Sequence, residues 1–404
     1  MLDFWVWMYT QPGVGSKKLK SLISKYGVNV SEALWAKIAI DVVPMSDHSH
    51  DLSNRSGGLS NCSGSLSCSS HVLSSGSGAL SRSWTPANIA KDIDKIKVIL
   101  ENYETRVIPF WSDSYPFKLK QIPDNPVFLF LKGKLCSEVC WDKSVAIIGT
   151  RAMTSYGKDV LMRLVQPLAG KEIAVVSGLA SGVDAEAHHQ LILNDNLRAC
   201  PIVVLPGGPC SGFPEMNRNL YDIILKKGII VSEYFPGTSI KPGMFVSRNR
   251  IIAGLSDCVV VVEAPAKSGA LITADFALDY NREVGAVPGS VFSRVSEGTN
   301  SLLKQGAFIV RDGYDILEVL DYNVDDKSRA EGISMKYVDE LASEFGISQS
   351  LACRLHARIT QGNLDIVELG KVVSLPVTRI RCILTRLEVN GILRLSPLGI
   401  IIFV

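Results

Sequence analysis

Residues 144–320 alternate short apolar runs with helical patterns, and this alternation limits the possible folds more than any other feature of the chain. The apolar runs, rich in β-branched residues, lie at 145–148, 173–176, 202–205, 229–231, 258–263, 284–287 and 308–310. Helical patterns lie between them, for example over 158–168 and 273–281. Apolar strands separated by helices are typical of a parallel sheet that helices cover on both faces. The pattern therefore predicts an α/β fold with a doubly wound, mostly parallel sheet.

The sequence before this region divides into two parts. Residues 1–45 predict a small helical unit, SAM-like or helix-hairpin-helix-like, in which the turn Gly13-Val14-Gly15 opens a lysine-bearing helix. The backbone N–H groups of such a turn could hold a DNA phosphate, or the turn could simply precede a solvated basic face. Residues 46–85 hold 15 serines and five glycines, so we expect a low-complexity insert without a packed core.

Two larger domains are expected after the insert. Residues 86–325 hold the sheet and begin with a helical pattern over 87–102. Residues 334–404 show helical spacing at 337–345, 351–359 and 376–390, and then a hairpin pattern at 392–395 and 400–404. Helices followed by a β-hairpin predict a winged-helix-like domain. Its arginines favour either recognition of double-stranded DNA or a solvated face on a structural or partner-binding module.

Composition excludes several classes of protein. No run of about 18 apolar residues occurs, so we expect no membrane-spanning helix. Nine cysteines without a C-x-x-C pair suit a reducing cytoplasm. The histidines and cysteines of residues 46–85 match no zinc pattern, and we expect neither a metal nor a cofactor. Because the net charge is only +2, nucleic-acid binding would require a local basic patch.

Glycine, serine and arginine gather in the loops that follow the predicted strands, where open α/β sheets bind ligands. The first loop lacks the G-x-G-x-x-G pattern of dinucleotide-binding proteins, but it carries an arginine, which suits phosphate. The second loop offers a hydroxyl and backbone N–H groups to an anion and leads to Asp184, the expected N-cap of the next helix. The candidate DNA-binding residues of these two loops are Gly149, Thr150, Arg151, Ser177 and Gly178.

Later loops add further candidates. An aromatic residue after the third strand could stack on an unpaired base or cover the edge of the core. Two arginines that flank an asparagine could bind phosphates, or they could bond backbone carbonyls and form ion pairs. A Ser-Gly pair opens another helix after the strand at 258–263. The candidates in these loops are Phe213, Asn217, Arg218, Arg248, Asn249, Arg250, Lys267, Ser268 and Gly269.

Taken together and in order, these motifs resemble the DNA-processing protein A family, also called DprA or Smf. The stretches that carry the resemblance are 145–151, 176–184, 247–256, 263–264, 267–274, 287–290 and 298–300. The resemblance implies an extended Rossmann-like fold, a homodimer and no catalysis. It also implies a cytoplasmic protein that binds and protects single-stranded DNA and loads the RecA recombinase in natural transformation. In the family the first-loop arginine and the Ser-Gly turn line the DNA pocket, which implies this role for Arg151, Ser177 and Gly178.

Two alternatives compete with this interpretation. A nucleotide-processing phosphoribohydrolase of a related Rossmann-like family would carry the loop Pro-Gly-Gly-x-Gly-Thr-x-x-Glu. Here Pro206-Gly-Gly208 continues as Pro209-Cys210-Ser211 and Glu215 is out of register, so the phosphate cradle and the placed carboxylate are missing. An adaptor that binds only proteins would leave the arginines and the Ser-Gly turns unexplained. The loop 205–214 also lacks the family's Gly-x-Gly-hydrophobic-Asp pattern.

Overall fold

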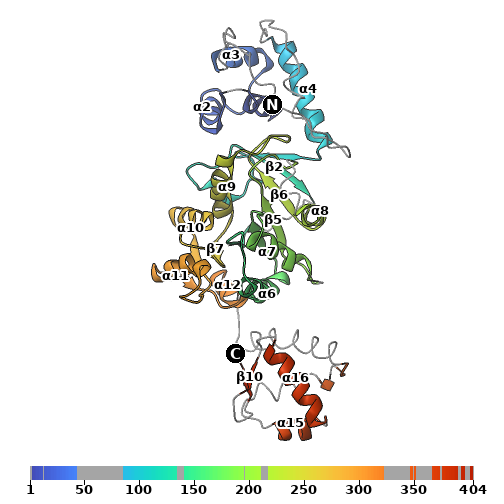
Figure 1. Cartoon of the computed structure of the whole chain (residues 1–404). Coiled ribbons are helices and arrows are strands. Elements are labelled where there is room, and N and C mark those ends of the chain that lie inside the picture. Colours follow the sequence, from blue (N-terminus) through green and yellow to red (C-terminus); the bar gives the residue numbers. More distant parts are fainter. Residues whose placement is uncertain are drawn as a thin grey trace, which may run out of the picture. The chain divides into compact units, whose positions relative to one another are not determined.

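The chain folds into two compact units, Met1–Tyr322 and Asn323–Val404 (Figure 1). The structure, a computed structural model, describes residues 2–11, 13–42, 85–133, 141–194, 196–210, 217–322, 346–348, 350–351, 366–373, 375–389, 393–395 and 401–403. Phe213 and the predicted helix over 337–345 lie outside these residues, as does nearly all of the predicted helix over 351–359.

A mixed sheet forms the centre of the first unit. In the described residues it has nine strands in the order β1-β2-β6-β5-β4-β3-β7-β8-β9. The strands are β1 (Arg106–Pro109), β2 (Phe128–Gly133), β3 (Ser144–Ile148), β4 (Ala174–Ser177), β5 (Cys200–Val204), β6 (Ile229–Ser232), β7 (Cys258–Val261), β8 (Glu283–Ala286) and β9 (Phe308–Ile309). Strands β3 to β9 pair in parallel, whereas β2 pairs antiparallel with both β1 and β6. The predicted α/β fold with a mostly parallel sheet is confirmed.

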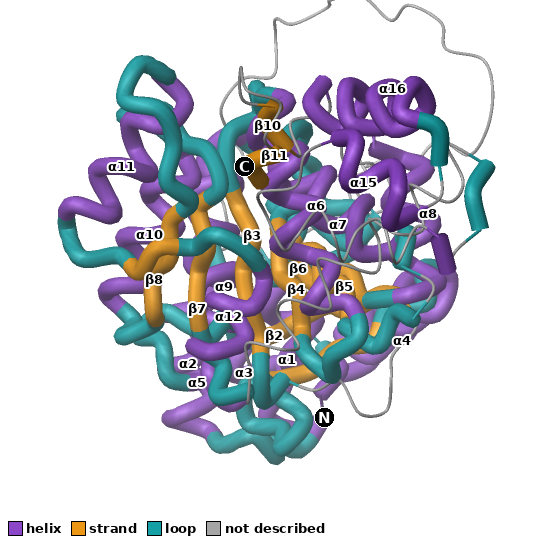
Figure 2. The backbone as a smooth tube through the Cα atoms, turned by 90° about the horizontal axis from the view of Figure 1, so that it is seen from below, coloured by secondary structure: helices purple, strands orange, loops and turns teal. Residues whose placement is uncertain are grey.

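Helices cover both faces of this sheet (Figures 1 and 2). Helices α5 (Phe117–Lys120), α9 (Pro242–Leu255) and α10 (Gly269–Asp279) share a buried apolar core with one face. Helices α6 (Ser155–Ala169), α7 (Val183–Ile192) and α8 (Arg218–Lys227) lie along the other face, and α12 (Gly313–Val319) packs on α6. Helix α11 (Glu297–Lys304) packs beside β8. The chain adds β4, β5 and β6 on one side of β3 and β7, β8 and β9 on the other, so the topological switch point lies between β3 and β7.

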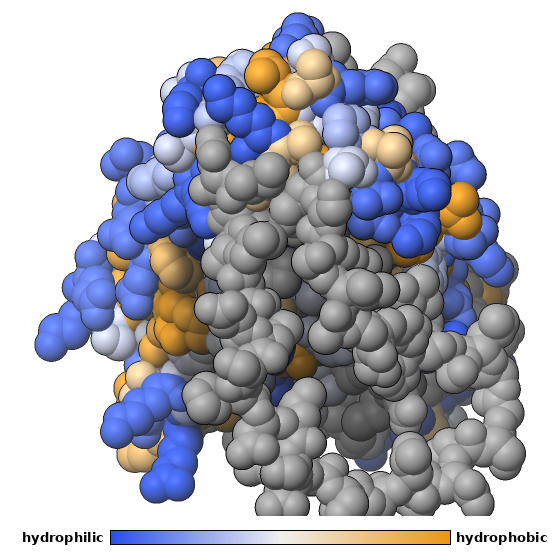
Figure 3. Space-filling model, turned by 90° about the horizontal axis from the view of Figure 1, so that it is seen from above, coloured by the Kyte–Doolittle hydropathy of each residue, from blue (hydrophilic) through white to orange (hydrophobic). Residues whose placement is uncertain are grey.

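Four N-terminal helices complete the first unit. They are α1 (Leu2–Tyr9), α2 (Ser16–Tyr26), α3 (Glu32–Val42) and α4 (Pro86–Asn102). Their apolar faces enclose a core rich in aromatic rings, in which the rings of Phe4 and Trp35 stack with centroids 5.2 Å apart. Phe128 and Phe130 of β2 belong to the same core, so these helices are packed on the sheet. Seen from the side of these helices, the described surface is mostly hydrophilic, with hydrophobic side chains scattered across it (Figure 3).

The second unit is described in part. It contains α15 (Ile366–Val373) and α16 (Val377–Val389), and the short strands β10 (Leu393–Leu395) and β11 (Ile401–Phe403) pair antiparallel. Leu369 of α15 and Ile380, Ile383 and Leu384 of α16 are buried. The helix predicted over 376–390 and the hairpin after it are therefore present, whereas the winged-helix assignment of the whole domain stays a proposal.

Candidate nucleic-acid interface

The carboxyl ends of β3, β4 and β5 bring three loops together. Gly182, with φ of +88°, packs so closely on the first loop that a Cβ there would lie 2.3 Å from the Thr150 carbonyl oxygen. Asn217, just before α8, donates its side-chain amide to the Leu179 carbonyl oxygen at 3.0 Å. These contacts join the loop that holds Arg151 to the turn after β4 and to the start of α8, where Arg218 is exposed.

Asp184 fixes the first two loops to one another. Helix α7 begins at Val183 with Gly182 as its N-cap, so the expectation that Asp184 is the N-cap was wrong. Its buried carboxylate instead accepts a hydrogen bond from the Gly178 N–H at 3.2 Å, and from the N–H groups of Gly149 and Ala180. Burial raises the pKa of Asp184, while nearby Arg248 and these N–H groups act in the opposite direction.

Arg248 supports the turn after β4 from inside the protein. Its side chain is buried, and its Nη1 donates to the carbonyl oxygens of Gly178 at 2.8 Å and Val204 at 2.5 Å. Burial lowers the pKa of Arg248 to about 10, so the guanidinium stays charged at neutral pH. Of the two interpretations of this arginine, the structure therefore supports carbonyl bonding and not an exposed phosphate contact.

Ser177 and Gly178 also form their hydrogen bonds within the protein. They are therefore not open anion-binding groups, which corrects their assignment. The Ser177 hydroxyl is fully buried and donates to the Ile147 carbonyl oxygen at 2.7 Å. The Gly178 N–H is bonded to Asp184, and a Cβ at Gly178 would lie 2.1 Å from the guanidinium of Arg248. Glycine is therefore required here for close packing, and both residues shape the loop from beneath.

The structure does not bring Arg250 to these loops. This arginine is buried, its Nη2 pairs with Glu233, and its Nε lies 3.1 Å from Asp124 Oδ2. Lys20 of the N-terminal helices lies close enough for Arg250 to lower its pKa, although burial is the larger cause. Arg250 thus pairs with two carboxylates, Glu233 and Asp124, and the ion-pair interpretation holds for it.

The loop after β7 joins the group through Asn249. The Asn249 amide donates to the Gly269 carbonyl oxygen at 3.3 Å, and its oxygen accepts from Arg248 Nε. Ser268 caps α10 by accepting a hydrogen bond from the Ala270 N–H, and Lys267 is exposed.

Together these loops form one surface, which we name the rim. It consists of residues 149–151, 178–182, 217–218 and 267–269. Its exposed cations are Arg151, Arg218 and Lys267.

Arg151 is the most distinctive residue of the rim. Its guanidinium is exposed and lies over the ring of the half-buried Phe245, 5.6 Å from the ring centroid. The sequence interpretation missed Phe245. The signal was its position three residues before Arg248, within a stretch that had already been singled out. This pair can contact both a phosphate and a base.

None of the helices among the described residues is long and apolar enough to span a membrane. Within the same ranges, no three histidine, cysteine, aspartate or glutamate side chains gather as a metal site would require.

Fold and rim together define an α/β protein of Rossmann-like architecture whose candidate anion-binding loops gather at the carboxyl edge of the sheet. The chain belongs to the DNA recombination-mediator protein A family, whose model matches residues 106–321. It is 42% identical over 213 residues to the DNA processing protein DprA of Bacillus subtilis, covering 53% of this chain and 70% of that protein. Identity to DprA of Streptococcus pneumoniae is 38% over 210 residues, covering 52% and 72%.

Comparison with solved structures agrees with this assignment. The X-ray structure of DprA from Streptococcus pneumoniae matches with a TM-score of 0.58 and 27% sequence identity. The match covers 80% of this chain and 99% of that one.

Proposed function

We propose that this protein binds single-stranded DNA at the rim. The observation that carries the proposal is the exposed Arg151 guanidinium, which is held over the Phe245 ring among loops that backbone contacts fix in place. Arginine binds phosphate with paired hydrogen bonds, and an adjacent ring offers a stacking surface that only an unpaired base can reach. Arg218 and Lys267 extend the positive charge along the rim.

The protein acts without catalysis in this proposal. Three buried carboxylates, those of Asp184, Glu233 and Glu263, lie at this edge of the sheet, and all three are used within the protein. Glu233 pairs with Arg250 and accepts the Ser247 hydroxyl at 3.1 Å. Asp184 accepts backbone N–H groups, and Glu263 accepts the N–H of Thr154 at 2.9 Å and its hydroxyl at 2.5 Å. A general acid or base must reach the proton that it transfers, and these carboxylates are held by other partners.

We further infer the biological setting from the family. The protein is a cytoplasmic homodimer that protects incoming single-stranded DNA and loads RecA onto it during natural transformation and recombination. The last strand of the sheet supports the homodimer: among the described residues β9 is the final strand, and Ile309 on it is 56% exposed. Exposed apolar side chains at an unpaired edge favour association with another copy.

The test is a fluorescence-anisotropy titration of the full-length protein with labelled oligo-dT and with a matched duplex, at two salt concentrations. We expect tighter binding to the single strand, and weaker binding as salt rises, because phosphate contacts release counterions. Equal affinity for both nucleic acids, or no binding to either, would refute the proposal.

A further inference from the structure

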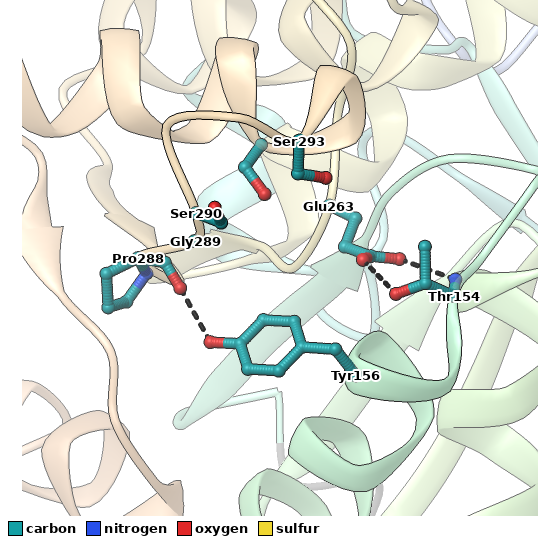
Figure 4. A pocket seen from close by; sticks show the side chains of 8 residues that line it. Thr154, Tyr156, Glu263, Pro288, Gly289, Ser290 and Ser293 are labelled. Carbon is teal, nitrogen blue, oxygen red and sulfur yellow. Dashed lines mark hydrogen bonds between the residues drawn. The ribbon is translucent and has the colours of Figure 1, made fainter.

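A pocket opens near the carboxyl ends of β3, β7 and β8, at the switch point of the sheet. Its volume is about 480 Å³, and it lies between the start of α6 and the loop 288–296 that follows β8 (Figure 4). Thr154 and Tyr156 line it from α6, and Ser290 and Ser293 line it from the loop. Open α/β sheets bind ligands at this position, yet the rim residues do not line this pocket.

The lining of the pocket selects for an uncharged, polar group. Glu263 is the only charged residue among those that line it, and its buried carboxylate is fixed by two hydrogen bonds from Thr154. A phosphate would meet this negative charge without a cation among the lining residues, which costs electrostatic energy. The hydroxyls of Ser290 and Ser293 can both donate and accept hydrogen bonds, as the edge of a nucleobase requires.

The loop that lines the pocket carries an exposed aromatic residue. The loop whose two sides carry Ser290 and Ser293 has Phe292 at its tip, 96% exposed, and its N–H is bonded to the Ser290 hydroxyl. On the other wall, the Tyr156 hydroxyl donates to the Pro288 carbonyl oxygen at 2.6 Å, which fixes the tyrosine ring (Figure 4). Such exposed rings stack on unpaired bases of any sequence.

The pocket is within reach of a strand held at the rim. Arg151 precedes Thr154 by three residues, so their Cα atoms are at most about 11 Å apart. We propose that this hydroxyl-lined pocket receives one unpaired nucleobase of the bound single strand, with Phe292 stacking beside it. The proposal rests on the proposed function, because the phosphate of that strand must first be held at Arg151.

The test compares labelled oligo-dT with an abasic oligonucleotide of the same length, using the full-length protein. In Ser293→Leu a larger apolar side chain fills the pocket, and Phe292→Ala removes the exposed ring of the same loop. We expect each variant to weaken oligo-dT binding about tenfold, since one stacked base contributes that much, and to leave abasic binding unchanged. Ser114→Leu, at an exposed serine that does not line the pocket, is the control and should match the wild type in both titrations.

The outcomes separate the two proposals. If the wild type binds oligo-dT and both pocket variants bind it equally well, the base pocket is wrong and the rim proposal stands. If the wild type binds neither oligonucleotide, the proposed function fails and the base pocket fails with it. Phe292 is almost fully exposed, so its variant should fold even if Ser293→Leu does not. If Ser293→Leu does not fold, wild-type affinity of Phe292→Ala for oligo-dT refutes the base pocket.

Discussion

Three arginines of the predicted site have three different environments. Arg151 is exposed at the rim, Arg248 bonds two buried carbonyl oxygens, and Arg250 pairs with carboxylates next to the N-terminal helices. Arg248 and Arg250 are two positions apart on α9, which turns them about 200° from one another around the helix axis. Two such side chains cannot reach the same ligand, so the pair is not a joint phosphate clamp.

Arg248→Ala should therefore destabilise the fold. The change leaves the Gly178 and Val204 carbonyl oxygens without this donor and leaves Asp184 without its neighbouring positive charge. We expect the free energy of unfolding to fall by about 2–5 kcal/mol, measured by urea denaturation. Arg151→Ala is the matched comparison and should change it by less than about 1 kcal/mol. Equal stabilities for the two variants would show that Arg248 is not a buried support.

At the scale of elements, helix α7 packs a histidine into the interior of the protein. His188 on this helix is fully buried, and its two ring nitrogens have no hydrogen-bond partner in the described part of the chain. Burial lowers the pKa of His188 from 6.5 to about 4, because a charged imidazolium would be removed from water. Acid must therefore weaken the packing of α7.

We expect this histidine to make stability dependent on pH. Because the folded-state pKa is depressed, the stability is fully present above pH 6.5 and is lost as the pH falls from 6.5 towards 4. Relative to His188→Leu, the wild type should lose about 3 kcal/mol of unfolding free energy between pH 7 and pH 4. The measurement is urea denaturation at several pH values. Parallel curves for the wild type and His188→Leu would contradict the assignment.

The sequence predicts an element or a side-chain role well when neighbouring residues determine it. It predicts poorly when the partners lie far away in the chain. Strands such as Val145–Ile148 were predictable because both faces are buried, which produces a continuous apolar run. Strand β1 was not predicted, since four residues that begin with an exposed arginine and end with a proline carry no periodic signal. The role of Arg248 was left open because it depends on carbonyl groups 70 and 44 residues away in the chain. Asp184 was misassigned for the same reason, since its partners include the N–H of Gly149 in a different loop.

At the scale of the whole molecule, the chain divides after Tyr322. The first unit holds the rim, the pocket and the aromatic core that joins the N-terminal helices to β2. We expect a fragment of residues 1–322 to fold alone and to bind oligo-dT with an affinity within about threefold of the full chain, because every rim residue lies in it. Circular dichroism melting and anisotropy titration test this. A fragment that shows no cooperative melting transition would contradict the division.

The most direct test of DNA binding at the rim is the salt dependence of oligo-dT affinity in the wild type, Arg151→Ala and Arg198→Ala. Arg198 is also exposed, and it pairs with exposed Glu172. It lies just before β5 and is therefore at the opposite edge of the sheet. Arg151→Ala should cost about 1.5–3 kcal/mol of binding free energy, and the slope of log affinity against log salt should fall in magnitude by about 0.7, as expected for one lost phosphate contact. Arg198→Ala should behave as the wild type. If Arg151→Ala keeps the wild-type affinity and slope, or if Arg198→Ala loses as much, single-stranded DNA does not bind where we propose.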